Sequence, residues 1–447
     1  MAPMVRVGTL PMRLLALEMG ADLVYTEELI DFKLLKCKRI ENKVLNTIDF
    51  VDESEGNNVV FRTCEKEKSK VILQIGTADV GRAVRAAKLV ENDVAGIDIN
   101  MGCPKEFSVK GGMGVALAAN LPKAKQILST LVKALKIPVT CKIRIKKTVE
   151  ETIEHVKELE TTGISAIAIH ARTRDERPHH KPHPEVIKAV CQEVKIPVIC
   201  NGGSKEIEKH SDIYKYKELC GASSIMIARA AQWNVSIFKK DGKMEPVLDV
   251  IQKYLKYAID YDSTAMNTKY CIQNILLSLQ ESEMGRRFLD AQIMEQIAEV
   301  FGMKEYCKKK QLEQQMKQAE LEQQENEISN DIEPLKKRLK LIDDDTIVEN
   351  IYFIRSNYGE SHDLPKSILH LFLLKNSPNL KPKYKIEKDG IHFRATLELN
   401  GKKYVSTSLE KNKKTAEQCA SLVACLHLGL VTKQELIANG SMKIIES

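Results

Sequence analysis

The sequence predicts an α/β protein built on a closed (β/α)8 TIM barrel, followed by a small helical domain and a compact α-β-β-β-α domain. Short apolar runs rich in β-branched residues recur at spacings of roughly 25 to 45 residues, and helix-like stretches separate them. Near the C-terminus the composition becomes basic, which marks a separate unit. At 447 residues, 43% of them hydrophobic, the chain can hold two or three domains with a sizeable core.

Seven strands of the barrel can be read directly, and an eighth is expected at the N-terminus, which favours a closed barrel over an open doubly wound sheet. The seven runs are ADLVYTE from Ala21, VILQIG from Val71, GIDINMGCP from Gly96, VTCKIRI from Val139, AIAIHAR from Ala166, PVICNGG from Pro197 and SSIMIARAA from Ser223. The longer gap before Val71 holds LNTIDFV and NVVFRTC, which predict a hairpin inserted as a lid or rim.

Polar residues follow the strand ends, which meet at one mouth of a barrel. They are Gln74, Asn100 with Cys103, Lys142 with Arg144, His170 with Arg172, Asn201-Gly202-Gly203, and Ala228-Arg229. Glycines after the seventh strand and an arginine after the eighth suit a phosphate-binding corner. A lysine on the fifth strand is costly unless it faces a fixed negative charge, such as an anionic reduced flavin. Taken singly, His170 is equally explained as a core histidine and Lys142 as a solvated strand end.

Cys103 stands just past a predicted strand, between Gly102 and Pro104, which cannot donate to a strand ladder. A thiol at this edge is placed for chemistry, although a free cysteine is also one of the residue types most often buried in a core.

These residues carry a resemblance to the tRNA-dihydrouridine synthases. APM, LQIG, DINMGCP followed by KGGMG, CKIR, IHART, CNGG and MIARAA occur in that family's order over roughly residues 1 to 300. The resemblance implies a flavin mononucleotide (FMN) barrel that reduces the C5=C6 bond of a uridine in tRNA, with NADPH as electron donor. Hydride would go from the flavin to C6, and Cys103 would give the proton to C5 as general acid.

The resemblance also implies roles for single residues. Pro3, Met4 and Gln74 would contact the flavin ring, Lys142 its N1/O2 edge, and His170, Asn201, Gly202, Gly203, Ala228 and Arg229 its phosphate arm. Asn100, Arg144 and Arg172 would face the RNA. Lys105 to Gly114 would be a flexible loop that carries Cys103 over a flipped base. The family's first strand precedes APM, so we expect this strand to be cut short here and the natural start to lie upstream.

The C-terminal segment resembles a double-stranded-RNA-binding domain. A helix from Pro365, three strands joined by turns at Asp389-Gly390 and Asn400-Gly401, and a helix capped by Asn412 predict the order α-β-β-β-α. From 361 to 430 there are 12 Lys and Arg against 6 Asp and Glu. Lys413 and Lys414 would bridge phosphates of an RNA duplex, and Arg355 would add a contact before the domain. The combination of this domain with the barrel resembles the eukaryotic tRNA-dihydrouridine synthases that act on position 20, and this resemblance implies a uridine at D-loop position 20.

The predicted domain boundaries are 1–240 for the barrel, 241–303 for a helical tRNA-binding domain, 304–345 for a charged linker, 346–432 for the RNA-binding domain and 433–447 for a tail. The eleven scattered cysteines form no C-x-x-C pair, which argues against a disulfide framework and a zinc ribbon. We expect a cytoplasmic monomer without a metal or membrane span. The alternatives are a catalytically silent RNA-binding protein that keeps the barrel as scaffold, and an FMN barrel enzyme acting on a small molecule.

Overall fold

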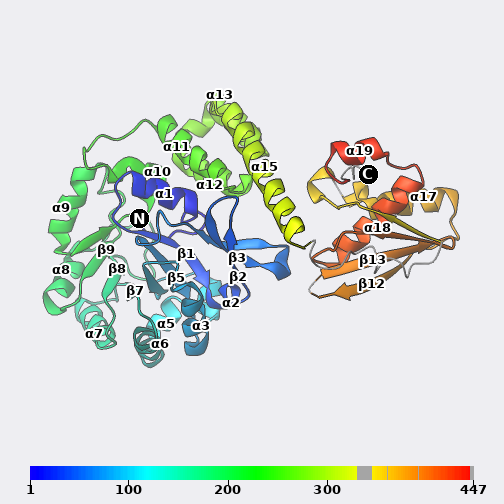
Figure 1. The fold of residues 1–447 in the computed structure, drawn as a ribbon. Coiled ribbons are helices and arrows are strands. Elements are labelled where there is room, and N and C mark those ends of the chain that lie inside the picture. Colours follow the sequence, from blue (N-terminus) through cyan, green and yellow to red (C-terminus); the bar gives the residue numbers. More distant parts are fainter. Residues whose placement is uncertain (330–344, 360, 391, 443–447) are drawn as a thin grey trace. The chain divides into compact units, whose positions relative to one another are not determined.

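A computed structural model describes the chain except for residues 330–344, 360, 391 and 443–447, and it divides into two units, Met1–Gln324 and Glu325–Ser447 (Figure 1). No described helix is both long enough and apolar enough to cross a bilayer. Part of the predicted linker, including the basic run from Pro334 to Leu341, lies outside the described residues. Each unit is described by itself below.

The first unit is built on a curled sheet of seven parallel strands in the order β1-β5-β6-β7-β8-β9-β10, which confirms the barrel-type fold. The strands are β1 (Val24–Ile30), β5 (Val71–Gly76), β6 (Gly96–Asn100), β7 (Val139–Arg144), β8 (Ala166–His170), β9 (Val198–Asn201) and β10 (Ser224–Met226). The covering helices are α3 (Val80–Val90), α6 (Leu121–Ala134), α7 (Val149–Glu160), α8 (Pro184–Glu193) and α9 (His210–Cys220). Figure 1 shows these helices arranged around the outside of the strands.

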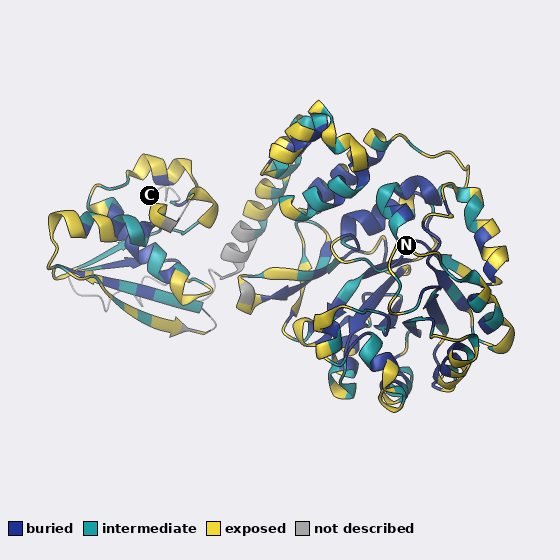
Figure 2. Cartoon of the chain, turned by 180° about the vertical axis from the view of Figure 1, so that it is seen from behind, coloured by how far each residue is buried: buried dark blue, intermediate teal, exposed yellow. Residues whose placement is uncertain are grey.

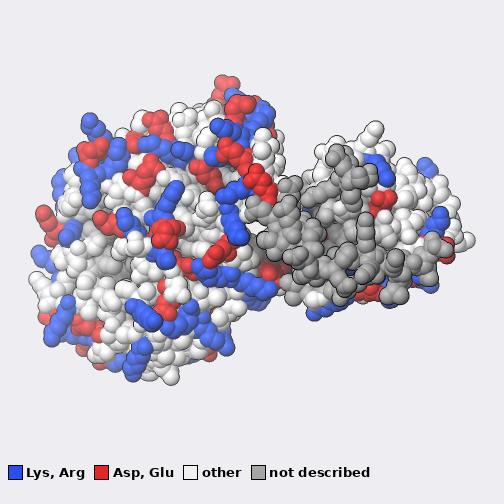
Figure 3. Space-filling view, in the orientation of Figure 1, with Lys and Arg blue, Asp and Glu red and all other residues white. Residues whose placement is uncertain are grey.

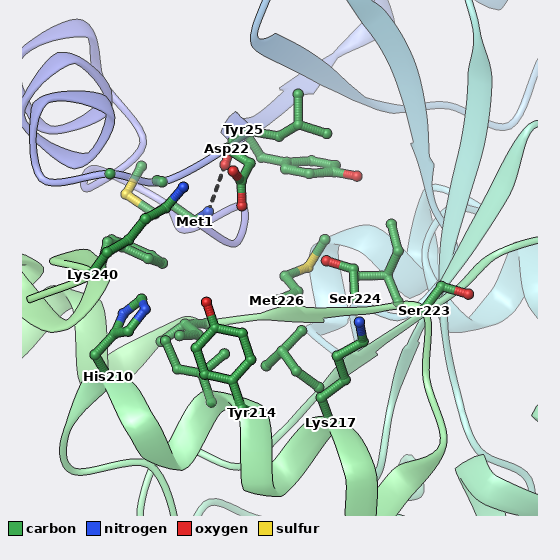
Figure 4. Close-up of a pocket in the computed structure, with 18 residues that line it drawn as sticks. Met1, Asp22, Tyr25, His210, Tyr214, Lys217, Ser223, Ser224, Met226 and Lys240 are labelled. Atoms are coloured by element: carbon green, nitrogen blue, oxygen red, sulfur yellow. Dashed lines mark hydrogen bonds between the residues drawn. The ribbon is translucent and has the colours of Figure 1, made fainter. Parts of the chain in front are cut away.

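Two residues stand where the eighth strand was expected. The Met1 ammonium donates to the carbonyl of Leu23, just before β1, and the Ala2 N–H donates to the carbonyl of Ile227, just after β10, both at 2.8 Å. Met1 and Ala2 therefore bridge the two edges of the sheet without forming a strand. Figure 4 shows Met1 at this place. Beside Met1 lies a cavity of about 270 Å³, and none of the predicted site residues lines it.

The apolar core lies between the sheet and its helices. Both faces of the sheet are buried, as is usual for parallel strands. Figure 2 shows the strands dark and the outer faces of the helices exposed. A smaller cluster fills the inside of the curled sheet below the mouth, made of Ala2, Tyr25, Ile72, Ala168 and Met226. The polar strand ends thus sit on a packed floor rather than over an open pore.

The insertion before β5 is larger than the predicted hairpin. Strands β2 (Lys38–Asn42), β3 (Thr47–Asp52) and β4 (Asn58–Thr63) form an antiparallel sheet, and the sequence analysis missed β2. The residues of β2 are exposed at nearly every position. The sequence of this strand therefore lacks the alternation of apolar and polar residues that would identify it. The fully buried pair of Arg13, on α1 (Leu10–Glu18), and Glu67 ties the end of this insertion to the barrel.

The helical region follows the barrel, and its first helix begins at Val247. Its helices are α11 (Val247–Asp260), α12 (Ala265–Leu276), α13 (Glu283–Asp290) and α14 (Met294–Val300). The following helix α15 (Lys304–Ser329) begins where a solvated linker was predicted. Cys307 is fully buried, and Gln314 donates to the carbonyls of Ile259 and Asp260 on α11. The first part of α15 therefore packs on the helical region, in contrast to the predicted boundary at residue 303.

The second unit contains the predicted order of α17 (Pro365–Asn376), β12 (Lys383–Asp389), β13 (His392–Leu399), β14 (Lys402–Ser406) and α18 (Lys413–His427). Asn400 and Gly401 both have positive φ, as the predicted two-residue turn requires, and the Asn412 side chain accepts the N–H of Thr415. A fourth strand, β11 (Thr346–Glu349), adds in parallel to β14.

The predicted tail from residue 433 is partly folded into this unit. It forms α19 (Lys433–Ala438), with Leu436 1% exposed, and Met442 makes a β-bridge to Ile351. The segments before and after the predicted α-β-β-β-α core therefore contact each other.

Candidate active site

The carboxyl ends of the parallel strands bring the predicted polar residues to one mouth. The strand register places Asn100 beside Lys142, Arg144 beside His170, and His170 beside Asn201. Gln74 lies on β5, next to β6, and its Nε2 donates to Asp98. Residues that are far apart in the sequence thus form a single polar ring.

Cys103 is half-buried on a turn that is held from two sides. The Asn100 Oδ1 accepts the N–H groups of Gly102 at 2.9 Å and of Cys103 at 3.1 Å. The Arg144 Nε donates to the carbonyl of Gly102 at 2.8 Å. Burial raises the pKa of the Cys103 thiol, so the thiol is protonated at neutral pH, as a proton donor must be.

The segment after Cys103, which was predicted to be a flexible loop, contains two short helices. It forms a one-turn helix, α4 (Glu106–Lys110), and a second short helix, α5 (Val115–Ala119). Gly112 and Gly114 have positive φ, and Gly111 does not. A Cβ on Gly114 would lie 2.4 Å from the Cys103 carbonyl oxygen, so only glycine permits this close packing.

A buried carboxyl below the mouth was missed in the sequence analysis. Asp98 is 0% exposed and accepts hydrogen bonds from Gln74 Nε2 and Thr140 Oγ1, both at 2.7 Å. Burial raises its pKa to about 6. The alternation of Ile97, Asp98, Ile99 and Asn100 could have revealed it, because Asp98 shares a strand face with Asn100.

Lys142 faces the barrel interior, where the charge of the buried Asp98 carboxyl favours the ammonium form. Within the described residues it has neither a hydrogen bond nor an ion pair, and burial lowers its pKa to about 8. An anionic group placed against this ammonium would raise its pKa again and stabilise the charged form. This arrangement fits a flavin that is negative along its N1/O2 edge.

A cavity of about 200 Å³ opens beside Lys142, at the ends of β7 to β10. Cations line it from several elements: Lys142, Arg144, Arg172, Arg177 and Arg229. His170, Asn201, Gly202, Ser204 and Ala228 complete most of the wall. Burial, and then the positive charge of the neighbouring side chains, lower the pKa of His170 well below its usual range, so this histidine is neutral.

The one carboxylate in this lining, Glu176, is engaged elsewhere, because it accepts from His183 and from the Thr173 N–H. The corner therefore has an excess of positive charge and neutral donors, which fits a phosphate. Arg177 and Ser204 were missed, since both lie on loops beyond the strand ends that carried the sequence signal.

Two predicted RNA contacts have partners within the protein. Arg172 is 1% exposed, and its guanidinium donates to the carbonyls of His180 and Gly202. Arg144 holds the Cys103 turn and also donates to the carbonyl of Thr173. Both residues shape the loops of the mouth.

Pro3 and Met4 lie directly after the residues that bridge β1 and β10. The Met4 carbonyl accepts the N–H groups of Val7 and Gly8, which turns the chain into α1. Both side chains are half-buried.

In the second unit, Lys413 and Lys414 are exposed at the start of α18, and the Lys413 ammonium lies 5.9 Å from the centre of the Phe393 ring. Arg355 donates to the carbonyls of Tyr358 and Gly359, so it is engaged in its own loop. On the face drawn in Figure 3, the barrel unit carries Lys and Arg intermixed with Asp and Glu, without a large area of one sign.

Two protein-family models match this chain. The model of the dihydrouridine synthase family matches residues 1–340, and that of the double-stranded RNA binding motif matches residues 365–428. The chain is similar to the tRNA-dihydrouridine(20) synthase [NAD(P)+] of Schizosaccharomyces pombe, with 41% identity over 286 residues, covering 62% of this chain and 59% of that protein. The synthase of the same name from Saccharomyces cerevisiae is 38% identical over 298 residues, covering 62% of this chain and 76% of that protein.

Among solved structures, the chain matches a tRNA-dihydrouridine(20) synthase dsRBD domain at 28% identity and a TM-score of 0.18, covering 19% of this chain and 89% of that one. The aligned part of the chain spans about three fifths of the length of the Schizosaccharomyces pombe relative. The family match covers residues 1–340, the segment that builds the polar mouth. The chain therefore belongs to the dihydrouridine synthase family.

Proposed function

We propose that this protein reduces one uridine of tRNA, at position 20 of the D-loop, to dihydrouridine, with FMN as its bound flavin and NADPH as its electron donor. The single observation that carries the proposal is the half-buried Cys103 thiol at the mouth, on a turn held by Arg144, which also lines the cation-rich cavity. The names of the yeast relatives support the substrate class, the position and a nicotinamide donor.

The reduction of uracil needs a hydride at C6 and a proton at C5. A reduced flavin bound at the mouth supplies the hydride. The Cys103 thiol supplies the proton, and Asn100 and Arg144 fix the turn that presents it. A uridine must leave its stack to reach this thiol.

The flavin would be held by the residues that the mouth brings together. Lys142 would face the N1/O2 edge, and Pro3, Met4 and Gln74 would contact the ring. The phosphate would lie in the cavity lined by His170, Asn201, Gly202, Ala228 and Arg229, with Gly203 adjacent. Arg177, which lines the same cavity, would add a further charge.

The second unit would hold the tRNA through its duplex arms. Lys413 and Lys414 stand at the start of α18, where backbone N–H groups and the helix dipole also favour phosphate. Arg144, Arg172 and Arg355 would reach RNA only by exchanging their present carbonyl partners. We propose that the enzyme acts as a cytoplasmic monomer.

The test is a turnover assay with purified protein, NADPH and unmodified tRNA transcript, scored for dihydrouridine by mass spectrometry. We expect the wild type to be yellow and to form dihydrouridine at position 20. A transcript with cytidine at that position should give no product. Product at another position would correct the site, and flavin without product would favour a small-molecule substrate.

Cys103→Ala isolates the proton step. The variant should bind flavin and accept hydride from NADPH at the wild-type rate, but its dihydrouridine formation should fall by roughly 10²–10⁴-fold, as expected for a lost general acid. Cys191→Ala, which removes another half-buried thiol, is the control and should leave the rate unchanged. Full activity of Cys103→Ala would exclude the proposed proton donor.

A further inference from the structure

The strand β1 contains a bulge that turns one glutamate into the barrel. Tyr25 lies opposite Ile72 of β5, but Glu28 lies opposite Gln74, so three steps along β1 match two along β5. Since Tyr25 and Gln74 both face the interior, this extra residue brings Glu28 to the same face. The preceding Glu27 remains outside, where its carboxylate accepts the N–H of Arg6 at 2.9 Å.

The structure leaves space for the Glu28 carboxyl at the mouth. A Cβ on Gly76 would lie 2.5 Å from Glu28 Oε1 and 3.1 Å from its Cδ, so glycine at this strand end lets the carboxyl pack on the backbone. Among the described residues, the buried Oε1 has no hydrogen-bond partner. Burial raises the pKa of Glu28 to about 7, and hydrogen bonding from Asn100 opposes this rise.

Glu28 acts on Cys103 through charge and through a shared neighbour. Its carboxylate raises the pKa of the Cys103 thiol, adding to the larger effect of burial. The geometric link runs through neighbouring strands: Glu28 lies opposite Gln74, whose Oε1 accepts from Asn100 Nδ2 at 3.3 Å. The Oδ1 of the same Asn100 accepts the N–H of Cys103. The other groups that face the thiol favour its ionised form: Lys105 on the same turn, the Ser108 hydroxyl on α4, and Lys142 and Arg144 on β7.

We propose that Glu28 is a positioning residue for the proton donor: its carboxylate offsets these cations, so that Cys103 stays a thiol up to a higher pH. This inference rests on the proposed function, in which Cys103 is the acid. Without Glu28, the cationic neighbours would lower the pKa of Cys103, and the thiolate, which cannot give a proton, would form at a lower pH.

The test is the pH dependence of Cys103 alkylation in the flavin-loaded full chain. Protein is treated with iodoacetamide between pH 7 and pH 11, and the Cys103 peptide is quantified by mass spectrometry. In Glu28→Gln we expect the alkylation midpoint to move to lower pH by about half a unit, so that alkylation is roughly threefold faster on the rising limb. On the alkaline side, the rate of product formation should begin to fall at a correspondingly lower pH than in the wild type.

Two matched variants decide the interpretation. Glu27→Gln makes the same charge change on the outer face and should keep the wild-type midpoint. Glu28→Asp keeps the charge and should restore most of the midpoint. An unchanged midpoint in Glu28→Gln, or an equal shift in Glu27→Gln, would overturn the proposal. Alkylation does not require tRNA, so a wild type that forms no dihydrouridine would count against the proposed function alone.

Discussion

At the scale of single residues, Gly114 sets how closely α5 approaches the Cys103 turn. It has φ of +57°, and a Cβ there would lie 2.4 Å from the Cys103 carbonyl oxygen and 2.6 Å from Ser108 Oγ. We expect Gly114→Ala to lower the free energy of unfolding by about 1–3 kcal/mol and to displace Cys103, which should reduce dihydrouridine formation strongly.

The control for this prediction is Gly112→Ala. Gly112 also has positive φ, but its Cβ would meet only the Ala78 Cβ, at 3.3 Å, and so would leave Cys103 in place. Chemical unfolding should show a loss of stability in both variants, and the turnover assay should separate them. Equal activity of the two variants would show that the close contact at Gly114 does not position the thiol.

The sequence allowed the mouth to be predicted at the residues whose signal is local. Asn100 and Lys142 lie near the ends of recognisable strands, Cys103 follows one, and all three lie where expected. Glu28 and Arg177 could not be found in this way. Glu28 faces inward because of a bulge, which the period-2 pattern does not reveal, and Arg177 reaches the cavity from a loop.

At the scale of secondary-structure elements, the strongest apolar periodicities gave the right elements and the weak ones did not. The barrel strands are continuous apolar runs, and they were predicted. β2 is exposed, and α15 is so polar that its composition resembles a linker, although Tyr306 and Cys307 attach its first turn to the helical region. The secondary structure of β2 and α15 depends on packing against other segments of the chain. A short window of sequence contains no information about those packing partners.

Helix α7 carries a buried histidine that should make the barrel sensitive to acid. His155 is 8% exposed, and burial, assisted by repulsion from Lys146, lowers its pKa to about 4. Below pH 6.5 the unfolded chain binds a proton at this side chain that the folded chain does not, so stability falls as the pH falls toward 4. The full contribution is about 3 kcal/mol.

His155→Leu should remove this dependence. Between pH 7.5 and pH 5, the wild type should lose about 2 kcal/mol more of its free energy of unfolding than the variant does. Urea titrations of both proteins at the two pH values measure the difference, because other groups contribute equally to both. A parallel loss in the two proteins would mean that His155 is protonated in the folded state.

At the scale of the whole molecule, the chain divides into two units: the barrel unit holds the polar mouth with Cys103, and the C-terminal unit contains the basic segment from 361 to 430, with 12 Lys and Arg against 6 Asp and Glu. Replacing both Lys413 and Lys414 by alanine should weaken tRNA binding and reduce the slope of log K against log salt by about 1.5–2, because two phosphate contacts are lost. Fluorescence anisotropy with labelled tRNA at several salt concentrations measures both quantities.

The paired replacement of Lys402 and Lys433 by alanine makes the same change in net charge at exposed positions away from the start of α18. It should leave the slope close to that of the wild type, because long-range charge alone is screened within about 10 Å at 0.1 M salt. Flavin reduction by NADPH should be unchanged in both double variants, since neither alters the barrel. If the two double variants reduced the slope equally, tRNA would be held by overall charge, and the start of α18 would have no special part in binding.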